Sequence, residues 1–249
     1  MNIYSPKSVS AKALIRITFI LSVLLLSNFN LLAKREKHYY VTLNTNKGEI
    51  VFLLYNQTPI HRNNFIKLAK EKFYDGVLFH RVIDNFMIQC GDPESKEKEP
   101  GKLYGNGGPG YDLPAEIVPG LYHKKGVVAA ARMGDNTNPT RKSSGSQFYI
   151  VKGKTFDEEG IKTVEERINT RNAANNINIK HTIPQDWREI YKTTGGTPHL
   201  DTQYTVFGEV VSGYETVEKI SASKTDSNDR PIEDVIILSV KVKRSRKLK

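Results

Sequence analysis

The sequence is poor in the residues that build covalent or metal-based frameworks. It holds a single cysteine, Cys90, among 249 residues, which excludes an intramolecular disulfide and a cysteine-based zinc cluster. The neighbours of Cys90 are typical of a β-strand, so we interpret it as a small buried hydrophobic residue. The histidines show no metal-ligand spacing. We therefore expect a fold held together by a hydrophobic core, with no metal and no cofactor.

Acidic residues are absent from the N-terminal part of the chain, where the first is Glu36. This part is basic, then apolar over residues 17–26, then polar, which is the layout of a secretory signal peptide. The apolar run is shorter than the about 20 residues that span a bilayer. We predict that residues 1–33 are a cleaved signal peptide and that the protein is periplasmic or secreted. The alternative is an uncleaved N-terminal segment that anchors the protein to a membrane.

Basic residues outnumber acidic ones and give the chain a net charge of +10. Three of the basic residues belong to the leader, and residues 244–249 form a basic tail at the other end. Such runs attract nucleic acid or anionic membranes. A solvated tail is the simpler interpretation, and we expect no nucleic-acid partner for an exported protein. Contact with a membrane is expected only through an uncleaved leader.

Short strand-like runs dominate residues 39–243, and turn signals rich in asparagine and glycine separate them. Helices are predicted over residues 59–72, where Thr58 is placed to act as N-cap and a proline follows it, and over about 214–222. The predicted strands are a hairpin over 39–55, then 78–82, 86–91, 126–132, 147–151, 202–209 and 232–242. Short strands with two separated helices favour a closed antiparallel barrel over repeated βαβ units.

Residues 152–198 interrupt the β pattern. Their first part is highly charged and predicts a helix that ends at about Ala174, and Pro184 begins a second, shorter helix. We expect a helical insertion in one barrel loop and not a separate domain. The alternative is that this segment is itself functional, as an arm that docks a partner.

Three sequence blocks carry the functional information. They are FHRVIDNFMIQCGD at 79–92, GSQFYI at 145–150 and HLDTQYTVFG at 199–208, with VVAAARM at 127–133 before the second. In this order they resemble the cyclophilin family of peptidyl-prolyl cis-trans isomerases, and the resemblance covers about residues 39–243. It implies an eight-stranded antiparallel barrel with a helix closing each end. It also implies isomerase activity on proline-containing polypeptides, which would assist the folding of exported proteins.

Prolyl isomerisation needs no nucleophile, because its barrier of about 18–20 kcal/mol comes from amide resonance that is lost as the C–N bond twists. A catalyst holds the proline ring in a dry pocket and aims a fixed donor at the groups whose charge changes. Arg81 is our candidate for that donor, since its guanidinium stays charged at any working pH. The resemblance places Arg81 at the catalytic arginine position of the family.

The resemblance also implies a substrate-binding set around the arginine. Its members are Phe86, Met87, Gln89, Ala131, Arg132, Gln147, Tyr149, Leu200, His199 and Tyr204. Tyr149 stands where phenylalanine is usual, and the residues at 132, 199 and 204 also depart from the eukaryotic pattern, which resembles the bacterial branch of the family. Strand alternation places Tyr149 on the pocket side and Phe148 in the core. Strict alternation separates Phe86 from Met87, so we expect a bend near Asn85 if both line one pocket.

Two features beside these blocks are interpreted as structural. His80 adjoins Arg81, but alternation turns its side chain away from the pocket, so we expect a hydrogen-bonded structural histidine. The run GNGGPG at 105–110 formally matches a nucleotide-binding pattern, yet prolines at 109 and 114 interrupt the helix that should follow. We expect a glycine-rich surface loop beside the peptide groove.

A second function stays open from the residues alone. A cyclophilin-like module, or a chaperone-like scaffold, would bind proline-containing segments without turning them over. The presence of Arg81 together with Phe86, Met87 and Gln89 favours the enzyme.

Overall fold

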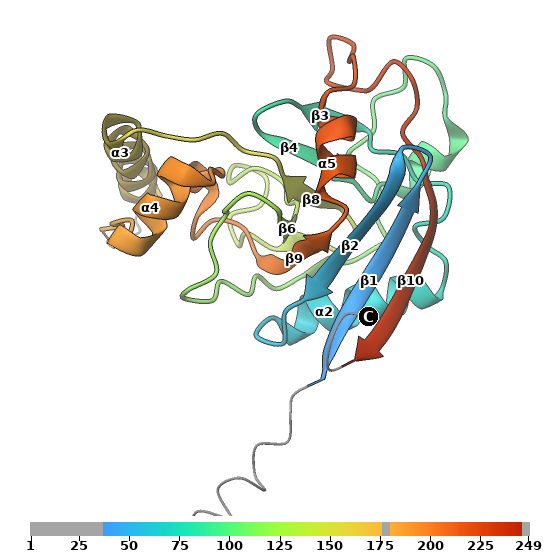
Figure 1. Ribbon diagram of the computed structural model, residues 1–249, viewed down its shortest axis with the longest axis horizontal. Helices are drawn as coiled ribbons and strands as arrows, with labels where there is room; N and C mark the ends of the chain where they lie inside the picture. The colour runs from blue at the N-terminus through green and yellow to red at the C-terminus, as the bar shows by residue number, and fades with distance from the viewer. Residues whose placement is uncertain (1–36, 176–179, 246–249) are drawn as a thin grey trace, which may run out of the picture. The chain divides into compact units, whose positions relative to one another are not determined.

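The computed structural model describes residues 37–175 and 180–245. The predicted leader and the last four residues of the predicted basic tail lie outside the described residues. An eight-stranded antiparallel sheet has the strand order β10-β1-β2-β9-β6-β8-β4-β3 (Figure 1). Its strands are β1 His38–Thr45, β2 Gly48–Leu54, β3 Arg81–Ile83, β4 Met87–Cys90, β6 Val127–Ala130, β8 Phe148–Val151, β9 Val206–Ser212 and β10 Ile237–Ser245. Two short strands, β5 Asp112–Leu113 and β7 Ser143–Ser144, form a second sheet.

Four α-helices accompany the sheet in the described part of the chain. They are α2 Pro59–Lys70, α3 Glu158–Ala174, α4 Gln185–Thr193 and α5 Tyr214–Ser221, with 3-10 turns η1 Pro93–Glu97 and η2 Pro198–Leu200. Figure 1 shows α2 and α5 at opposite ends of the sheet, as the resemblance implied for the two helices. No helix among the described residues combines the length and apolar character that crossing a membrane requires.

The main sheet forms a half-barrel, and the predicted closed barrel is not confirmed. Its strand ladder has two ends, at β3 and β10. In the described residues these ends meet through an isolated bridge between Leu78 and Ile236 and through a few backbone hydrogen bonds, such as Phe79 N to Val235 O at 2.9 Å. The ladder stays open because β3 is only three residues long and the chain before it is irregular.

Side-chain alternation gives the central strands two apolar faces with different roles. Ile88 and Phe148 belong to the main core, which α2 and α5 help to fill. Their neighbours Met87 and Tyr149 point the other way and join a second cluster with Leu200. The prediction that Tyr149 and Phe148 face opposite sides is thus confirmed, and the second cluster lies where the functional blocks meet.

A distant carboxylate holds the start of α2. Thr58 occupies the N-cap position and Pro59 follows it, as predicted, but the Thr58 side chain makes no capping hydrogen bond. Instead Glu116 accepts hydrogen bonds from the backbone N–H groups of Ile60, at 3.1 Å, and His61, at 2.9 Å. A carboxylate at a helix N-terminus satisfies otherwise unpaired donors and complements the helix dipole. Local sequence does not reveal this cap, since Glu116 lies 55 residues along the chain from His61.

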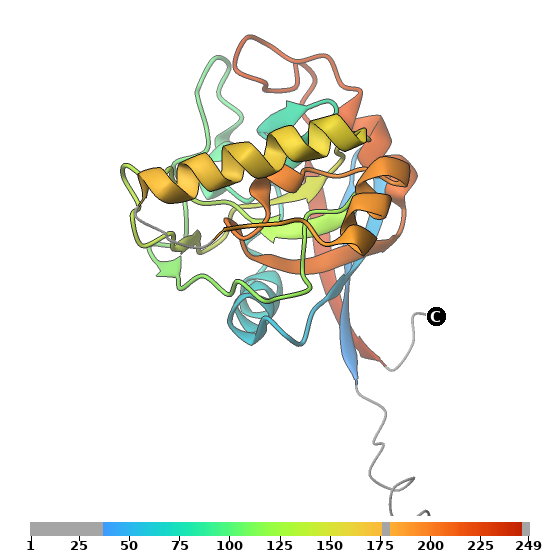
Figure 2. The same ribbon diagram turned by 90° about the vertical axis from the view of Figure 1, so that its left-hand side faces the viewer.

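The connection between β8 and β9, residues 152–205, carries both α3 and α4, close to the predicted helix positions. Asp157 caps α3 by accepting a hydrogen bond from Gly160 N at 2.7 Å. The two helices bury a small core of their own, made of Ile161, Val164, Ile168, Ile183 and Tyr191. Figures 1 and 2 show α3 and α4 together on the side of the domain away from β1 and β10.

The last strand differs from its predicted bounds at both ends. It begins at Ile237 and not at Ile232, and it continues to Ser245, which pairs with His38. Arg244, expected in the basic tail, therefore lies in β10, with its guanidinium 5.5 Å from the ring centroid of Tyr39. Pairing with β1 satisfies the backbone groups of this segment, which outweighs its polar composition.

Replacing Glu116 with alanine should lower the free energy of unfolding by about 1–2 kcal/mol, because two N–H groups at the start of α2 lose their acceptor. Urea unfolding followed by circular dichroism measures this change. Glu166→Ala is the control, since Glu166 is exposed on α3 and should shift the free energy by less than about 0.5 kcal/mol. Equal effects of the two substitutions would show that Glu116 does not cap α2.

Candidate active site

The β3–β4 hairpin positions the arginine. Arg81 pairs with Gln89 across the hairpin, so the two side chains lie on one face. The turn contains Asn85 with a φ of 59°, in the left-handed region that asparagine tolerates better than most residues. Phe86 is part of this turn and not of the ladder, and alternation does not apply to it. The predicted bend is therefore confirmed, and Phe86 lines the same pocket as Met87.

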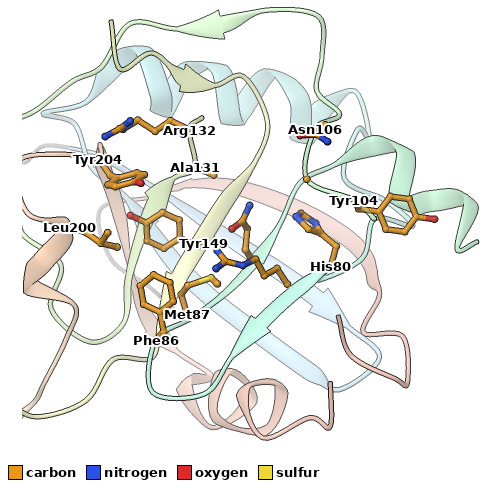
Figure 3. Close-up of a pocket in the computed structure, with 13 residues that line it drawn as sticks. His80, Phe86, Met87, Tyr104, Asn106, Ala131, Arg132, Tyr149, Leu200 and Tyr204 are labelled. Carbon is orange, nitrogen blue, oxygen red and sulfur yellow. The ribbon is translucent and has the colours of Figure 1, made fainter. Parts of the chain in front are cut away.

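A pocket of about 260 Å³ lies beside this hairpin (Figure 3). Nine predicted residues line it: Arg81, Phe86, Met87, Gln89, Ala131, Arg132, Tyr149, Leu200 and Tyr204. They come from the hairpin, the end of β6, β8 and the segment around η2. The structure thus brings together residues from all of the sequence blocks that were singled out.

Two predicted residues lie beside this pocket. The side-chain amide oxygen of Gln147 accepts a hydrogen bond from Gln89 Nε2 at 3.1 Å, and its Nε2 donates to Gly107 O at 2.8 Å. Gln147 lines an adjoining pocket that Gln89 shares. The ring of His199 packs against Phe86 with their centroids 5.5 Å apart. Each of the two residues thus contacts a side chain that lines the pocket, Gln89 and Phe86 respectively.

Four further residues line the pocket, and sequence reasoning did not assign them to it: His80, Tyr104, Gly105 and Asn106. The last three belong to the loop after β4, which confirms the predicted glycine-rich loop beside the groove. Asp92 holds this loop by accepting hydrogen bonds from Gly105 N at 2.6 Å and Gly107 N at 3.0 Å. A Cβ atom at Gly107 would lie 2.1 Å from an Asp92 oxygen, so only glycine fits there. Asp92 is the last residue of the first sequence block, and it was the sequence signal that could have assigned this loop to the pocket.

The orientation of the His80 side chain differs from the prediction. Its side chain lines the pocket, whereas alternation was expected to turn it away. The argument failed because β3 begins only at Arg81, so strand alternation does not extend back to His80. The ring is buried, and neither nitrogen makes a hydrogen bond of standard geometry with a described residue. Burial is the main cause that lowers the pKa of His80 to about 4, so the ring is neutral at pH 7.

The charge of Arg81 lies at the rim of a pocket that apolar and polar side chains line together. Its Nε is 3.6 Å from Asp229 Oδ2, and both side chains are 43% exposed. The backbone of Asp229 also accepts a hydrogen bond from Val82 N at 2.8 Å, which ties this loop to β3. Among the described residues no acidic side chain lines the pocket. The guanidinium, 6.0 Å from the ring centroid of Phe86, is thus able to address a neutral polar group of a ligand.

The second cation of the pocket is already paired. Arg132 Nη1 lies 2.6 Å from Asp135 Oδ1, and the arginine side chain is only 4% exposed. Its Nε donates to Gln203 O at 2.9 Å, and its guanidinium lies 4.5 Å from the ring centroid of Tyr204. Arg132 therefore braces the pocket wall, and Arg81 is the arginine whose fork is open to a ligand.

A family model described as "Cyclophilin type peptidyl-prolyl cis-trans isomerase/CLD" matches residues 40–242. The chain belongs to the cyclophilin family. This cyclophilin is 32% identical over 209 residues to a protein of Staphylococcus haemolyticus named "Putative peptidyl-prolyl cis-trans isomerase", covering 84% of this chain and 93% of the relative. It is 35% identical over 203 residues to a Staphylococcus aureus protein of the same name, covering 81% and 90%. It is thus a peptidyl-prolyl cis-trans isomerase with bacterial relatives, as the sequence blocks predicted.

Solved structures agree with this cyclophilin in fold. A cyclophilin type peptidyl-prolyl cis-trans isomerase of Cryptosporidium parvum matches with a TM-score of 0.58 and 24% identity, covering 83% of this chain and 98% of that one. A structure of the same protein in the presence of the dipeptide Ala-Pro matches with a TM-score of 0.56 and 24% identity, covering 81% and 96%. At this identity the likeness establishes the fold alone.

The buried His80 should make the stability of this cyclophilin depend on pH. Because its pKa is about 4 in the folded state and about 6.5 in an unfolded chain, the unfolded state binds more protons between these values. The contribution of His80 to the free energy of unfolding is therefore fully present above about pH 6.5 and is lost as the pH drops towards 4. His80→Gln should reduce the loss between pH 7 and 4.5 by on the order of 2 kcal/mol. Urea unfolding at both pH values measures it, and an unchanged loss would contradict the assignment.

Proposed function

We propose that this isomerase rotates X–Pro peptide bonds by packing the proline ring against Phe86, Met87 and Tyr149 while Arg81 stabilises the twisted amide. The observation that carries this proposal is the position of Arg81, an open cation at the rim of a pocket of about 260 Å³. Gln89 pairs with Arg81 across the hairpin and would align the peptide backbone. The ring is held in place, and the carbonyl before it rotates.

The chemistry needs only binding and electrostatics. Twisting the C–N bond removes amide resonance, so the carbonyl oxygen loses negative charge and a lone pair localises on the proline nitrogen. A fixed guanidinium can donate hydrogen bonds to either group, and such a donor accelerates the reaction only if it binds the twisted amide better than the planar one. The apolar wall of Phe86, Met87 and Tyr149 excludes water from the bond, which strengthens the interaction.

Proline-containing polypeptides are the substrate class that fits this site. The structure of the Cryptosporidium parvum protein in the presence of Ala-Pro supports this choice by analogy. The pocket accepts a small apolar ring, and the adjoining pocket lined by Gln147 offers room for the chain that follows. A binding module without turnover is the alternative. It would make the same contacts with the peptide but would not need a charge at position 81.

Arg81→Ala should lower kcat/KM on a short X–Pro peptide by about 100-fold to 1,000-fold, the usual effect of removing one donor to a transition state. Arg81→Lys should recover part of the loss, because a point charge remains without the fork. A protease-coupled isomerisation assay measures both variants. Arg167→Ala is the control, since Arg167 is exposed on α3, and it should retain full activity. Equal rates for Arg81→Ala and the wild type would overturn the mechanism, and binding without wild-type turnover would favour the module.

We further propose that the enzyme acts on proteins outside the cytoplasm. The support is the composition of residues 1–33, which are basic, then apolar, then polar, as in a signal peptide. Folding clients whose slow steps are X–Pro isomerisations would be its targets.

N-terminal sequencing of the protein from separated soluble and membrane fractions tests this proposal. A mature chain that begins shortly after Ala33 in the soluble exported fraction is the expected result. A full-length chain in the membrane fraction would instead establish an anchor. A full-length chain in the cytoplasm would overturn the proposal of export.

A further inference from the structure

A chain of buried hydrogen bonds runs from α4 to the wall of the proline pocket. Tyr191 on α4 donates its hydroxyl proton to Asp201 Oδ2 at 2.7 Å. The other oxygen of Asp201 accepts a hydrogen bond from His123 N at 2.8 Å and lies 3.0 Å from His123 Nδ1. His123 Nε2 lies 3.0 Å from the hydroxyl of Tyr149, which lines the pocket. All four side chains are at most 4% exposed.

The direction of each hydrogen bond follows from the groups that take part. Burial raises the pKa of Tyr149 and of Tyr191 above the usual range, so both hydroxyls keep their protons. The carboxylate of Asp201 only accepts, so His123 donates from Nδ1, and in the neutral ring Nε2 is then the acceptor. The hydroxyl of Tyr149 therefore donates to His123. Each polar group in the chain has a partner, which is the condition for a stable buried network.

Backbone contacts also hold the segment that follows α4 against His123. Thr197 N donates to His123 O at 2.8 Å, and Gly196 forms isolated bridges with Lys124 and Lys154. A Cβ atom at Gly196 would lie 2.2 Å from His123 O, so this approach requires glycine. The connection between β8 and β9 is thus attached to the residue that holds Tyr149.

The ring of Tyr149 is a wall of the pocket, and its orientation decides the shape of the space for proline. Its ring lies parallel to that of His123, with an interplanar angle of 13°, and meets Tyr204 edge-on at a centroid distance of 6.0 Å. Figure 3 shows its hydroxyl on the side of Leu200 and Tyr204, away from His80. The hydrogen bond to His123 holds this end of the ring inside the protein and leaves its face to the pocket.

We propose that Tyr191 is a positioning residue for substrate binding: acting through Asp201 and His123, it fixes the hydroxyl of Tyr149 and with it the wall against which the proline ring packs. The β8–β9 connection is then part of the binding apparatus of the enzyme. This inference rests on the proposed function, because it takes the pocket beside Arg81 as the proline site.

Removing the Tyr191 hydroxyl separates this proposal from a role in folding alone. Tyr191→Phe should raise KM for an X–Pro peptide by about threefold to tenfold, since a looser wall binds the ring less well, while kcat stays within about twofold. The measurement is the isomerisation rate against peptide concentration at a temperature where circular dichroism shows each variant folded. Tyr122→Phe is the matched control, because Tyr122 packs on the same α4 through Trp187, at a centroid distance of 4.2 Å, outside the hydrogen-bond chain. Its KM should not change.

A double-mutant cycle with Tyr149→Phe gives the decisive result. If Tyr191 acts through the Tyr149 hydroxyl, its substitution should change KM by less than about 1.5-fold once that hydroxyl is absent. The same KM increase in both backgrounds would overturn the proposal, as would an unchanged KM for Tyr191→Phe alone. A wild-type enzyme without turnover would instead contradict the proposed function, so the two failures are distinguishable.

Discussion

The arrangement on which this structure depends is the pairing of β4 with β8, whose side chains alternate between two apolar clusters. One face carries Ile88 and Phe148 into the main core, and the other carries Met87 and Tyr149 to the pocket. Because the two faces are one residue apart along each strand, a register shift by a single residue would exchange core and site. The core thus fixes the register, and the register places the side chains that line the pocket.

The two arginines of the pocket show how the surroundings decide what a cation does. Arg132 is buried against Asp135 and Tyr204, and its charge serves the architecture. Arg81 is half-exposed, and Asp229 approaches only its Nε side. A charge at the edge of a pocket in a protein surface interacts more strongly with a polarised amide than a charge in bulk water does. The same residue type is paired and buried in one place and open to a ligand in the other.

Patterns of period two predicted which side chains face the pocket wherever regular strands run. Tyr149 on the pocket side, Phe148 in the core and the bend at Asn85 all follow from alternation and turn chemistry. The predicted orientation of His80 and the predicted side-chain cap by Thr58 failed because neither residue lies inside a regular element that the local sequence describes. His80 precedes β3, and the cap of α2 comes from Glu116, far along the chain. The closed barrel is not confirmed for a related reason, since closure depends on how two distant segments meet.

By itself, the sequence determined the family, the order of its blocks and the identity of the groups available for chemistry, because these depend on residue type and spacing along the chain. Only the tertiary structure decided which of those groups share a pocket. It added His80 and the loop at Tyr104, Gly105 and Asn106 to the lining, and it connected Tyr191 to Tyr149 through Asp201 and His123. Such contacts join residues far apart in the chain, and the free energy of packing and hydrogen bonding across the whole fold selects them, not the propensity of any one segment.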